Sequence, residues 1–276
     1  MAQLSMKYAE YAASPRLAWL VERFWMLEGP GSNVPDAILP DGRIELVFHV
    51  GARFNRHRLG GIERQPLALL AGQLTEPLVL SHEGDARVAA IRLRPSAAQA
   101  LLRFSVIEIT GRIVDLETVL PPTGELRERL FDARDDRERI ACLERWLEAT
   151  WRRVSALRSS AAPPADVDAV VSEILRTDGR ARIATVAARV GLGPRRLQRR
   201  FADAVGLSPK QFARIIRLQR ALRLVRSGLP LADVALACGY YDQAHMALDF
   251  RHLAAMSPDV WREHAGALAP LFVSQA

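Results

Sequence analysis

An internal repeat in the last third of the chain limits its possible folds more than any other feature. Two segments, residues 186–209 and 234–258, carry the same residue types in the same order. Their first matches lie 48 positions apart: Val186, Ala187 and Gly191 correspond to Val234, Ala235 and Gly239. The later matches lie 49 apart: Leu197, Phe201, Ser208 and Pro209 correspond to Met246, Phe250, Ser257 and Pro258. Self-similarity of this kind indicates one supersecondary unit that occurs twice.

Each copy has the pattern of a helix-turn-helix unit. The first helix is expected to end at Gly191 in one copy and at Gly239 in the other, because the turn requires a residue that tolerates positive φ. A second helix follows, with Pro194 at its first position in one copy and Asp242 as its N-cap in the other. A long helix, residues 209–226, is predicted to join the two units.

The second helix of the first copy has an apolar face and a basic face. Leu197 and Phe201 are four residues apart and share one side, which packs on the preceding helix. Arg195, Gln198 and Arg199 lie on the opposite side. An apolar back with a basic, amide-bearing front is typical of a helix that reads the major groove of DNA. The alternative is an ordinary solvated face, and two copies in register favour the DNA-binding interpretation.

The second copy, VALACGYYDQAHMALDFRHLAAMSPDVWR, resembles the signature of the AraC family of bacterial transcription regulators. The resemblance rests on the Ala-x3-Gly-Tyr turn, the Asp-Gln-Ala-His start of the next helix, the Phe250-Arg251 pair and the Ser257-Pro258 step. It covers the last third of the chain and implies a double helix-turn-helix domain that binds double-stranded DNA. One position departs from the pattern. Ala255 stands where the first copy has Gly206, so we expect the second recognition helix to end differently.

The resemblance also implies which side chains of the first unit meet DNA. It places base contacts at Arg195, Gln198 and Arg199. Arginine can form paired hydrogen bonds with guanine, and glutamine can do so with adenine. Contacts with the phosphate backbone are expected at four further residues: Arg196, Arg200, Lys210 and Arg251.

The second unit is expected to read fewer bases. Ala244, Ala247 and Leu248 occupy the positions that match Arg195, Gln198 and Arg199, and they cannot form paired bonds with a base edge. Gln243 and His245 remain as candidates for base contact, with a cap or a backbone contact as the alternative for both. We therefore expect the first unit to supply most of the sequence specificity.

The basic charge of the chain is confined to the repeat region. From Val167 to the end there are 16 Lys and Arg against 9 Asp and Glu, whereas the first 166 residues hold 22 of each. Solubility alone would not separate the charge in this way. A basic, arginine-rich domain suits the recognition of phosphate and guanine.

The remaining composition favours two globular domains in the cytoplasm. A chain of 276 residues is long enough for two cores. No apolar run is long enough to span a membrane, and the N-terminus lacks the apolar core of a signal peptide. The two cysteines, Cys142 and Cys238, are too few for a disulfide framework or a metal site.

The first half of the chain has the alternation of a β-rich domain. Residues 43–50 and 87–94 alternate apolar and polar side chains, and further strands are expected at 21–27, 67–71 and 77–81, with a helix at 95–102. The segment around Phe24-Trp25 and the Leu39-Pro40-Asp41-Gly42 turn look like the often cupin-like sensor half of some AraC-type regulators. The predicted fold class is α+β, with a β-rich, cupin-like barrel or sandwich before an all-α tandem helix-turn-helix domain.

Nothing in this half indicates catalysis. The three histidines, His49, His57 and His82, lack the His-x-His spacing of a cupin metal site, so they are expected to be surface or satisfied core residues. There is no nucleophile motif, phosphate loop or dinucleotide fingerprint. We therefore predict no catalytic residues, no metal and no cofactor. Trp25, Phe48 and Phe54 could line a ligand pocket, but core packing is the expectation.

Two helical patterns, residues 124–134 and 136–154, precede the repeat domain. The second carries Ile140, Leu143, Leu147 and Trp151 at helical spacing, and it could pack on its own barrel or pair with a second subunit. The resemblance favours dimerisation. The predicted domains are residues 1–158 and 166–276, joined by a Ser-Ala-Pro linker at 159–165, with Asp166 as the cap of the next helix.

These observations predict a regulator that binds DNA in two successive major-groove segments and is not an enzyme. The expected partners are double-stranded DNA, a small-molecule effector in the N-terminal domain, RNA polymerase and a second copy of the chain, without a membrane. Two alternatives remain open. One is a cupin-type enzyme that carries a DNA-binding domain, and the other is a regulator without effector that is controlled by its abundance.

Overall fold

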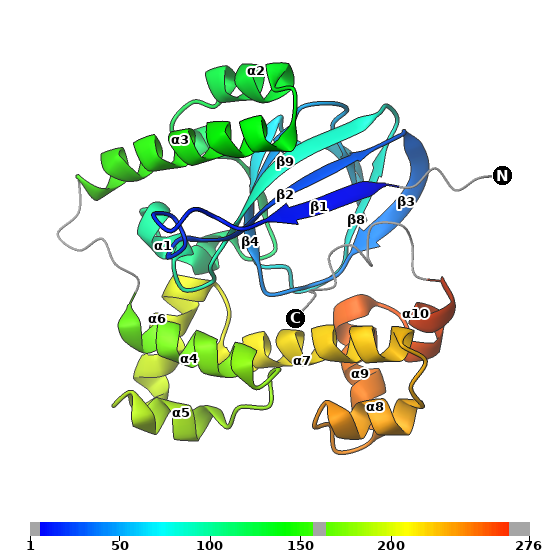
Figure 1. Ribbon diagram of the computed structural model, residues 1–276. Coiled ribbons are helices and arrows are strands. Elements are labelled where there is room, and N and C mark those ends of the chain that lie inside the picture. Colours follow the sequence, from blue (N-terminus) through cyan, green and yellow to red (C-terminus); the bar gives the residue numbers. More distant parts are fainter. Residues whose placement is uncertain (1–5, 157–163, 265–276) are drawn as a thin grey trace.

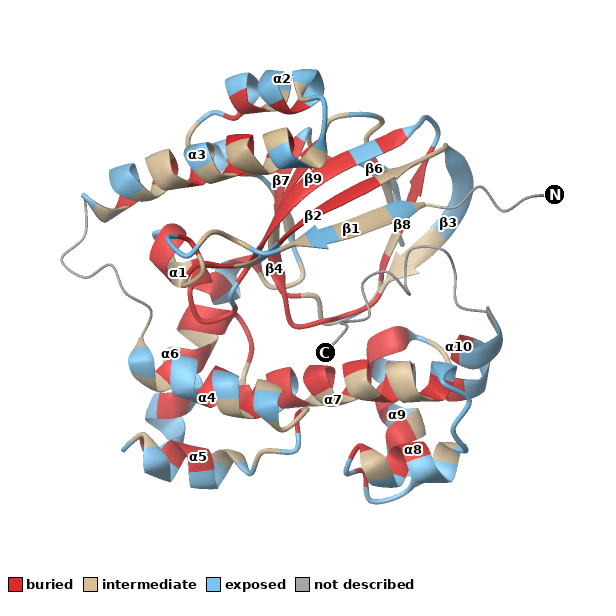
Figure 2. Ribbon diagram, viewed as in Figure 1, coloured by how far each residue is buried: buried red, intermediate tan, exposed pale blue. Residues whose placement is uncertain are grey.

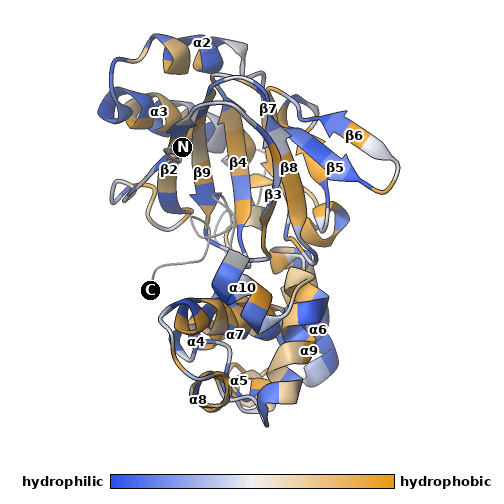
Figure 3. Ribbon diagram, turned by 90° about the vertical axis from the view of Figure 1, so that its right-hand side faces the viewer, coloured by the Kyte–Doolittle hydropathy of each residue, from blue (hydrophilic) through white to orange (hydrophobic). Residues whose placement is uncertain are grey.

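The computed structural model describes residues 6–156 and 164–264, which form a β-rich part and a helical part (Figure 1). The β-rich part precedes α4 and the helical part begins with it. The two parts lie one above the other in Figure 3. The predicted linker lies mostly outside the described residues. Its last residue, Ala165, already belongs to α4.

Two antiparallel sheets form the β-rich part. The larger has the order β1 (Lys7–Tyr11), β2 (Val21–Gly29), β9 (Ala86–Leu93), β4 (Ile44–His49), β7 (Ala68–Ala71) and β10 (Ile113–Asp115). The smaller has the order β3 (Ser32–Ile38), β8 (Leu78–His82), β5 (Asn55–Arg58) and β6 (Gly61–Arg64). Trp25 and Val47 of the larger sheet share one apolar cluster with Leu78 and Leu80 of the smaller. The sheets thus face each other, and the predicted barrel or sandwich is confirmed.

Helices cover the other face of the larger sheet (Figures 1 and 2). They are α1 (Ala98–Leu101), α2 (Gly124–Asp132) and α3 (Asp136–Ser155), with the 3₁₀ turns η1 (Val106–Ile109) and η2 (Leu116–Thr118). Leu143 and Leu147 of α3 belong to the same buried cluster as Phe48 of β4, whose ring centroid lies 5.5 Å from that of Trp146. The sequence left two roles open for this helix, packing on its own barrel or pairing with a second subunit. In the structure its apolar face packs on its own sheet.

The helical part contains both predicted helix pairs. Its helices are α4 (Ala165–Arg176), α5 (Ile183–Arg189), α6 (Pro194–Val205), α7 (Pro209–Arg226), α8 (Leu231–Ala237), α9 (Gln243–Ala254) and α10 (Pro258–His264). The units are α5–α6 and α8–α9, and α7 joins them. Gly191 and Gly239 have φ of 66° and 74°, as the turns require.

Two expectations about helix ends are wrong. Asp166 is not the N-cap of α4, because the helix begins one residue earlier with Pro164 at that position; its carboxylate accepts a hydrogen bond from the Val167 N–H in the first turn. Ala255 does not give α9 a different end. It adopts φ of 54°, and Gly206 adopts 87° at the same place after α6, so both helices end in the left-handed conformation.

The segment between β3 and β4 packs against α7. Leu39 is buried in the core of the helical part. Gln219 of α7 donates a buried hydrogen bond of 2.7 Å to the Pro40 carbonyl. Gly42 has φ of 78°, and a Cβ there would lie 2.9 Å from a ring carbon of Phe212. A second contact joins η1 to the end of α6, where the Thr110 hydroxyl donates to the Gly206 carbonyl.

Candidate functional site

The front of α6 presents the three predicted base-reading side chains to solvent. Pro194 occupies the first helical position, as expected, and Leu197 and Phe201 are buried. Arg195, Gln198 and Arg199 are exposed. The apolar side thus holds the helix against its domain and leaves guanidinium and amide donors free to meet base edges, the chemistry of direct readout.

The four residues predicted to meet phosphate differ in how free they are. Arg196 and Lys210 are exposed, Lys210 in the first turn of α7, and Arg251 is exposed near the end of α9. Arg200 is half-buried, and its guanidinium donates to the Asp166 carboxylate of α4 over 2.8 Å. Within the described residues Arg200 thus links two helices of its own domain.

The second unit presents little polar chemistry. Asp242 is the N-cap of α9, as predicted, and accepts from the His245 N–H over 2.7 Å. Gln243 and His245 are exposed, and the His245 ring lies edge-on to Tyr240 at 5.4 Å between centroids. Leu248, at the position that matches Arg199, is exposed as well.

Asp249 does not belong to the exposed face of α9. It is buried and pairs with Arg214 of α7 over 2.6 Å. This ion pair anchors α9 on α7 and keeps a carboxylate away from the phosphate backbone. Asp249 would repel phosphate only if it faced outward.

The long helix α7 sets the distance between the two units. Its 18 residues match the predicted bounds and span about 27 Å. Five of its side chains are buried at helical spacing: Phe212, Ile215, Ile216, Gln219 and Leu222. Figure 1 shows α6 and α9 near opposite ends of α7, and Figure 3 shows them on the same side of the domain. Two major-groove segments of one DNA face are about 34 Å apart, which suits this arrangement.

A cavity of about 70 Å³ lies in the β-rich part. Trp25 and Phe54 line it, so two of the three aromatic residues assigned to core packing face this space, whereas Phe48 packs under α3. Asp41, Arg43, Glu45 and His49 contribute polar groups. None of these four was predicted as a site residue, although the alternation of residues 43–50 puts Arg43, Glu45 and His49 on one face of a strand.

The three histidines have partners within the domain, as expected for satisfied core residues. His49 Nε2 lies 3.1 Å from the Gln65 side-chain oxygen, and burial lowers its pKa to about 4, so the ring is neutral near pH 7. His57 meets the Ser81 hydroxyl, and His82 meets the Gly84 carbonyl. Within the described residues no group of three or more His, Cys, Asp or Glu is placed to hold a metal ion. No described helix is long and apolar enough to cross a membrane.

Two family models match this chain. One is a helix-turn-helix domain and covers residues 186–264. The other is a domain of unknown function and covers residues 9–115. Each model matches less than half of the chain, and together they fall on the helical part and the β-rich part.

Curated relatives match only the helix-turn-helix region. The transcriptional activator RhaR of Cronobacter sakazakii is 32% identical over 79 residues, which are 28% of each chain. The transcriptional regulator MtrA of Neisseria gonorrhoeae is 38% identical over 71 residues, 25% of this chain and 24% of its own. The chain thus spans about a quarter of the length of the relatives that it matches.

A solved structure of ToxT from Vibrio cholerae aligns with 99% of this chain and 100% of its own at 10% identity, with a TM-score of 0.47. The AraC-like transcriptional activator CuxR aligns with 85% of this chain and 86% of its own at 11% identity, with a TM-score of 0.33. Scores at this level carry no argument about function.

Proposed function

Because the helical part of this chain is a helix-turn-helix domain of the AraC type, we propose that the protein is a sequence-specific DNA-binding transcription regulator. It reads one major-groove segment with α6 and positions itself on the next with α9. We include in the proposal that residues 166–276 act as the DNA-binding domain and residues 1–158 as the sensor domain.

One observation carries the proposal: Arg195, Gln198 and Arg199 stand exposed on the front of a helix whose back is fully packed. Within the described residues these side chains form no hydrogen bond or ion pair with the rest of the protein. Their donors match the acceptors that guanine and adenine show in the major groove. Exposed Arg196, Lys210 and Arg251 add positive charge around the recognition helices.

An effector in the β-rich part would be close to α7. Asp41 and Arg43 line the cavity, while Leu39, Pro40 and Gly42 of the same segment pack on α7. A ligand that shifts this segment therefore acts on the helix that holds the two reading units apart. This contact supports an effector-responsive regulator over one that is controlled by abundance alone.

Three finer features belong to the proposal. The protein acts in the cytoplasm, has no enzymatic activity, and works as a homodimer that contacts RNA polymerase. The apolar face of α3 packs on its own sheet and is therefore not available to a second subunit. Sedimentation of the full chain at micromolar concentration tests the dimer independently of DNA.

The test of the function is selection of DNA sites from a random library by the full chain, followed by affinity measurements on the selected site. Arg195→Ala, Gln198→Ala and Arg199→Ala are each expected to weaken binding by about 1–3 kcal/mol and to relax the preference at one or two base pairs. Arg129→Ala, on exposed α2, is the matched control and should bind as the unchanged protein does. Unchanged affinity and preference in all three α6 variants would show that α6 does not read bases.

A further inference from the structure

The cavity between the two sheets combines apolar walls with a charged wall. Most of its lining residues are apolar and come from both sheets, among them Trp25, Val47 and Leu69 of the larger sheet and Leu78 and Leu80 of the smaller. Asp41 and Arg43, in the turn before β4, and Glu45, in β4, bring charge to this space. An apolar space with a few convergent polar groups is the usual form of a small-molecule site.

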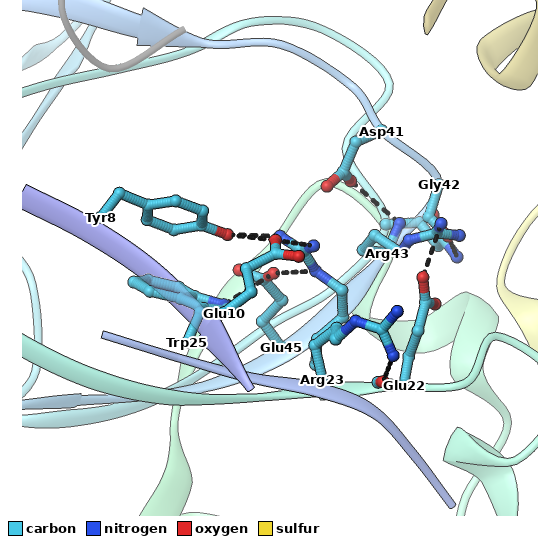
Figure 4. Close-up of polar contacts among 11 residues, drawn as sticks. Tyr8, Glu10, Glu22, Arg23, Trp25, Asp41, Gly42, Arg43 and Glu45 are labelled. Carbon is cyan, nitrogen blue, oxygen red and sulfur yellow. Dashed lines mark hydrogen bonds and ion pairs between the residues drawn. The ribbon is translucent and has the colours of Figure 1, made fainter. Parts of the chain in front are cut away.

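Both buried guanidinium groups beside the cavity already have carboxylate partners (Figure 4). Arg92 pairs with Glu45 over 2.9 Å and with Glu10 over 2.8 Å. Arg43 pairs with Glu22 over 2.8 Å. The two arginine charges are therefore matched by three carboxylates before Asp41 is considered.

Asp41 is the carboxyl group that remains without an ion pair. It is 6% exposed, and its hydrogen-bond partner is the Arg43 backbone N–H, 3.0 Å from the carboxylate oxygen. In the described part of the chain no cationic side chain lies within ion-pair distance of it. Burial, and then the nearby Glu45, raise the pKa of Asp41 to about 7. A carboxylate buried in this way gains more from a positive partner than an exposed one does.

We propose that this cavity binds a compact apolar organic cation, with its ammonium group on Asp41 and its apolar body among the aliphatic and aromatic side chains of the two sheets. Trp25 and Phe54 belong to the lining of the cavity, and aromatic rings of this kind attract cations. Only the role of the cation as effector rests on the proposed function. The binding site itself stands on the unpaired carboxyl and the cavity.

An anionic ligand fits the charges less well. Two donors of Arg43, Nε and Nη1, are buried without partners and would donate to an anion. An anion would, however, add to an excess of negative charge, because the four carboxyl groups Glu10, Glu22, Asp41 and Glu45 lie beside two guanidinium groups. Asp41 and Glu45 line the cavity, whereas Glu22 and Glu10 are 25% and 32% exposed. A cation reduces that excess instead.

Calorimetric titration of the full chain with three compounds of matched shape tests the proposal: benzylamine, benzoate and benzyl alcohol. At pH 8 benzylamine is expected to bind at least tenfold more tightly than the other two. Equal or tighter binding of benzoate or benzyl alcohol, or no binding of benzylamine, overturns the proposal. A benzoate preference would assign the cavity to anions through Arg43.

The pH dependence of the unchanged protein adds a readout that needs no variant. Protonation of Asp41 competes with the cation, so benzylamine should bind about tenfold more tightly at pH 8 than at pH 6. The other groups around the site are Glu45, Glu10, Glu22, Arg43, Arg92, Tyr8 and His49. Among them, burial raises the pKa of Tyr8 above its ordinary value and lowers that of His49 to about 4, so neither of these two groups titrates between pH 6 and pH 8. An affinity that is equal at both values contradicts a contact with Asp41.

Asp41→Asn keeps the shape of the side chain and removes its charge. It is expected to weaken benzylamine binding at least tenfold at pH 8 and to remove the pH dependence. Asp85→Asn, in the exposed loop before β9, is the matched control and should bind as the unchanged protein does. Wild-type affinity in Asp41→Asn would reject the site.

DNA binding separates this proposal from the proposed function. If benzylamine binds with the expected pH dependence but leaves DNA affinity unchanged, the cation site is supported and its role as effector is wrong. If DNA affinity for the selected site is absent throughout, the regulator proposal fails while the calorimetric result stands.

Discussion

Asp41 lies where three structural features meet: a turn, a contact between the two parts of the chain, and a cavity. Its backbone segment turns between two strands, its neighbours Pro40 and Gly42 pack on α7, and its own carboxyl is buried beside Glu45. The turn provides the N–H of Arg43 as its hydrogen-bond donor but no charge. One side chain thus holds a carboxyl that is stable in the folded protein mainly when it carries a proton.

The pKa of Asp41 predicts how stability changes with pH. The folded pKa of about 7 lies above the ordinary value of 3.8, so between these values the folded state binds more protons than the unfolded state. The free energy of unfolding contributed by this group therefore falls as pH rises from about 4 to 7, by at most about 1.4 kcal/mol per pH unit. Asp41→Asn should flatten the curve and be at least as stable as the unchanged protein at pH 8. Urea denaturation at pH 5 and pH 8 measures this difference.

Asp85→Asn serves as the control, because an exposed carboxyl lacks the burial that shifts Asp41. Its unfolding free energies should follow those of the unchanged protein at both pH values. Parallel pH curves for Asp41→Asn and the unchanged protein would contradict a raised pKa at Asp41.

At the scale of elements, the two helix-turn-helix units have the same backbone conformation but expose different side chains. Both have a positive-φ glycine in the turn, a second helix with two buried residues four apart, and a left-handed end. On their fronts α6 carries arginine and glutamine, whereas α9 carries alanine and leucine. The common features maintain the fold, and the differing features determine what each unit can bind.

The difference predicts unequal reading of the DNA site. Randomising the half that meets α6 should weaken binding strongly, because bidentate contacts are lost at several base pairs, each by about 1–3 kcal/mol. Randomising the half that meets α9 should cost less, since Ala244, Ala247 and Leu248 stand where α6 has Arg195, Gln198 and Arg199. Selection at fixed salt, with each half randomised in turn, measures both. Equal information in the two halves would contradict the assignment.

The end of α9 predicts a stabilising substitution. Ala255 has φ of 54°, a conformation that costs a residue with a Cβ about 1 kcal/mol and costs glycine little. Ala255→Gly should therefore raise the free energy of unfolding by up to about 1 kcal/mol. Ala254→Gly, one residue earlier in the helix and buried, should lower it. Urea denaturation of both variants is the measurement, and a loss of stability in Ala255→Gly would count against strain at this end.

At the scale of the whole molecule, the two domains share one segment. Leu39 completes the core of the helical domain, while Asp41 and Arg43 line the cavity of the β-rich domain. A second contact joins η1 to α6, where the Ser105 hydroxyl donates to Asp203 over 2.8 Å. The β-rich part and the helical part therefore do not pack as independent bodies in this structure, and a change in the β-rich part has a physical route to α6 and α7.

A substitution at Gly42 measures how much the contact between its segment and α7 contributes to stability. Gly42→Ala should destabilise the chain by about 1–3 kcal/mol, because its Cβ would lie 2.9 Å from Phe212 and 3.1 Å from Ile216. Gly111→Ala is the matched control, with a similar φ of 71° and no atom closer than 4.0 Å. Thermal denaturation of both variants separates the clash from the cost of positive φ. Equal losses would mean that the segment can move away from α7 without cost.

Local patterns in the sequence predicted the elements that are periodic and strongly marked. The bounds of α7, the turn glycines and the cap at Asp242 follow from local rules of helix geometry. The five predicted strands are present within one or two residues, because alternation over a half-buried strand is itself local. Strands β1, β3, β5, β6 and β10 were not predicted. Several of them are short or largely exposed, which leaves little apolar alternation to recognise.

Repeat spacing and helical period are enough to predict the tandem units and the side chains that α6 presents. Three features become visible only in the folded chain: Asp249 faces inward, Leu39 belongs to the core of the helical part, and Asp41 has no ion pair among the described residues. Each of these depends on a partner far away in the chain: Arg214, α7, or the arginines that other carboxylates already occupy. Burial and charge pairing are sums over neighbours in space, and no window of sequence contains those neighbours.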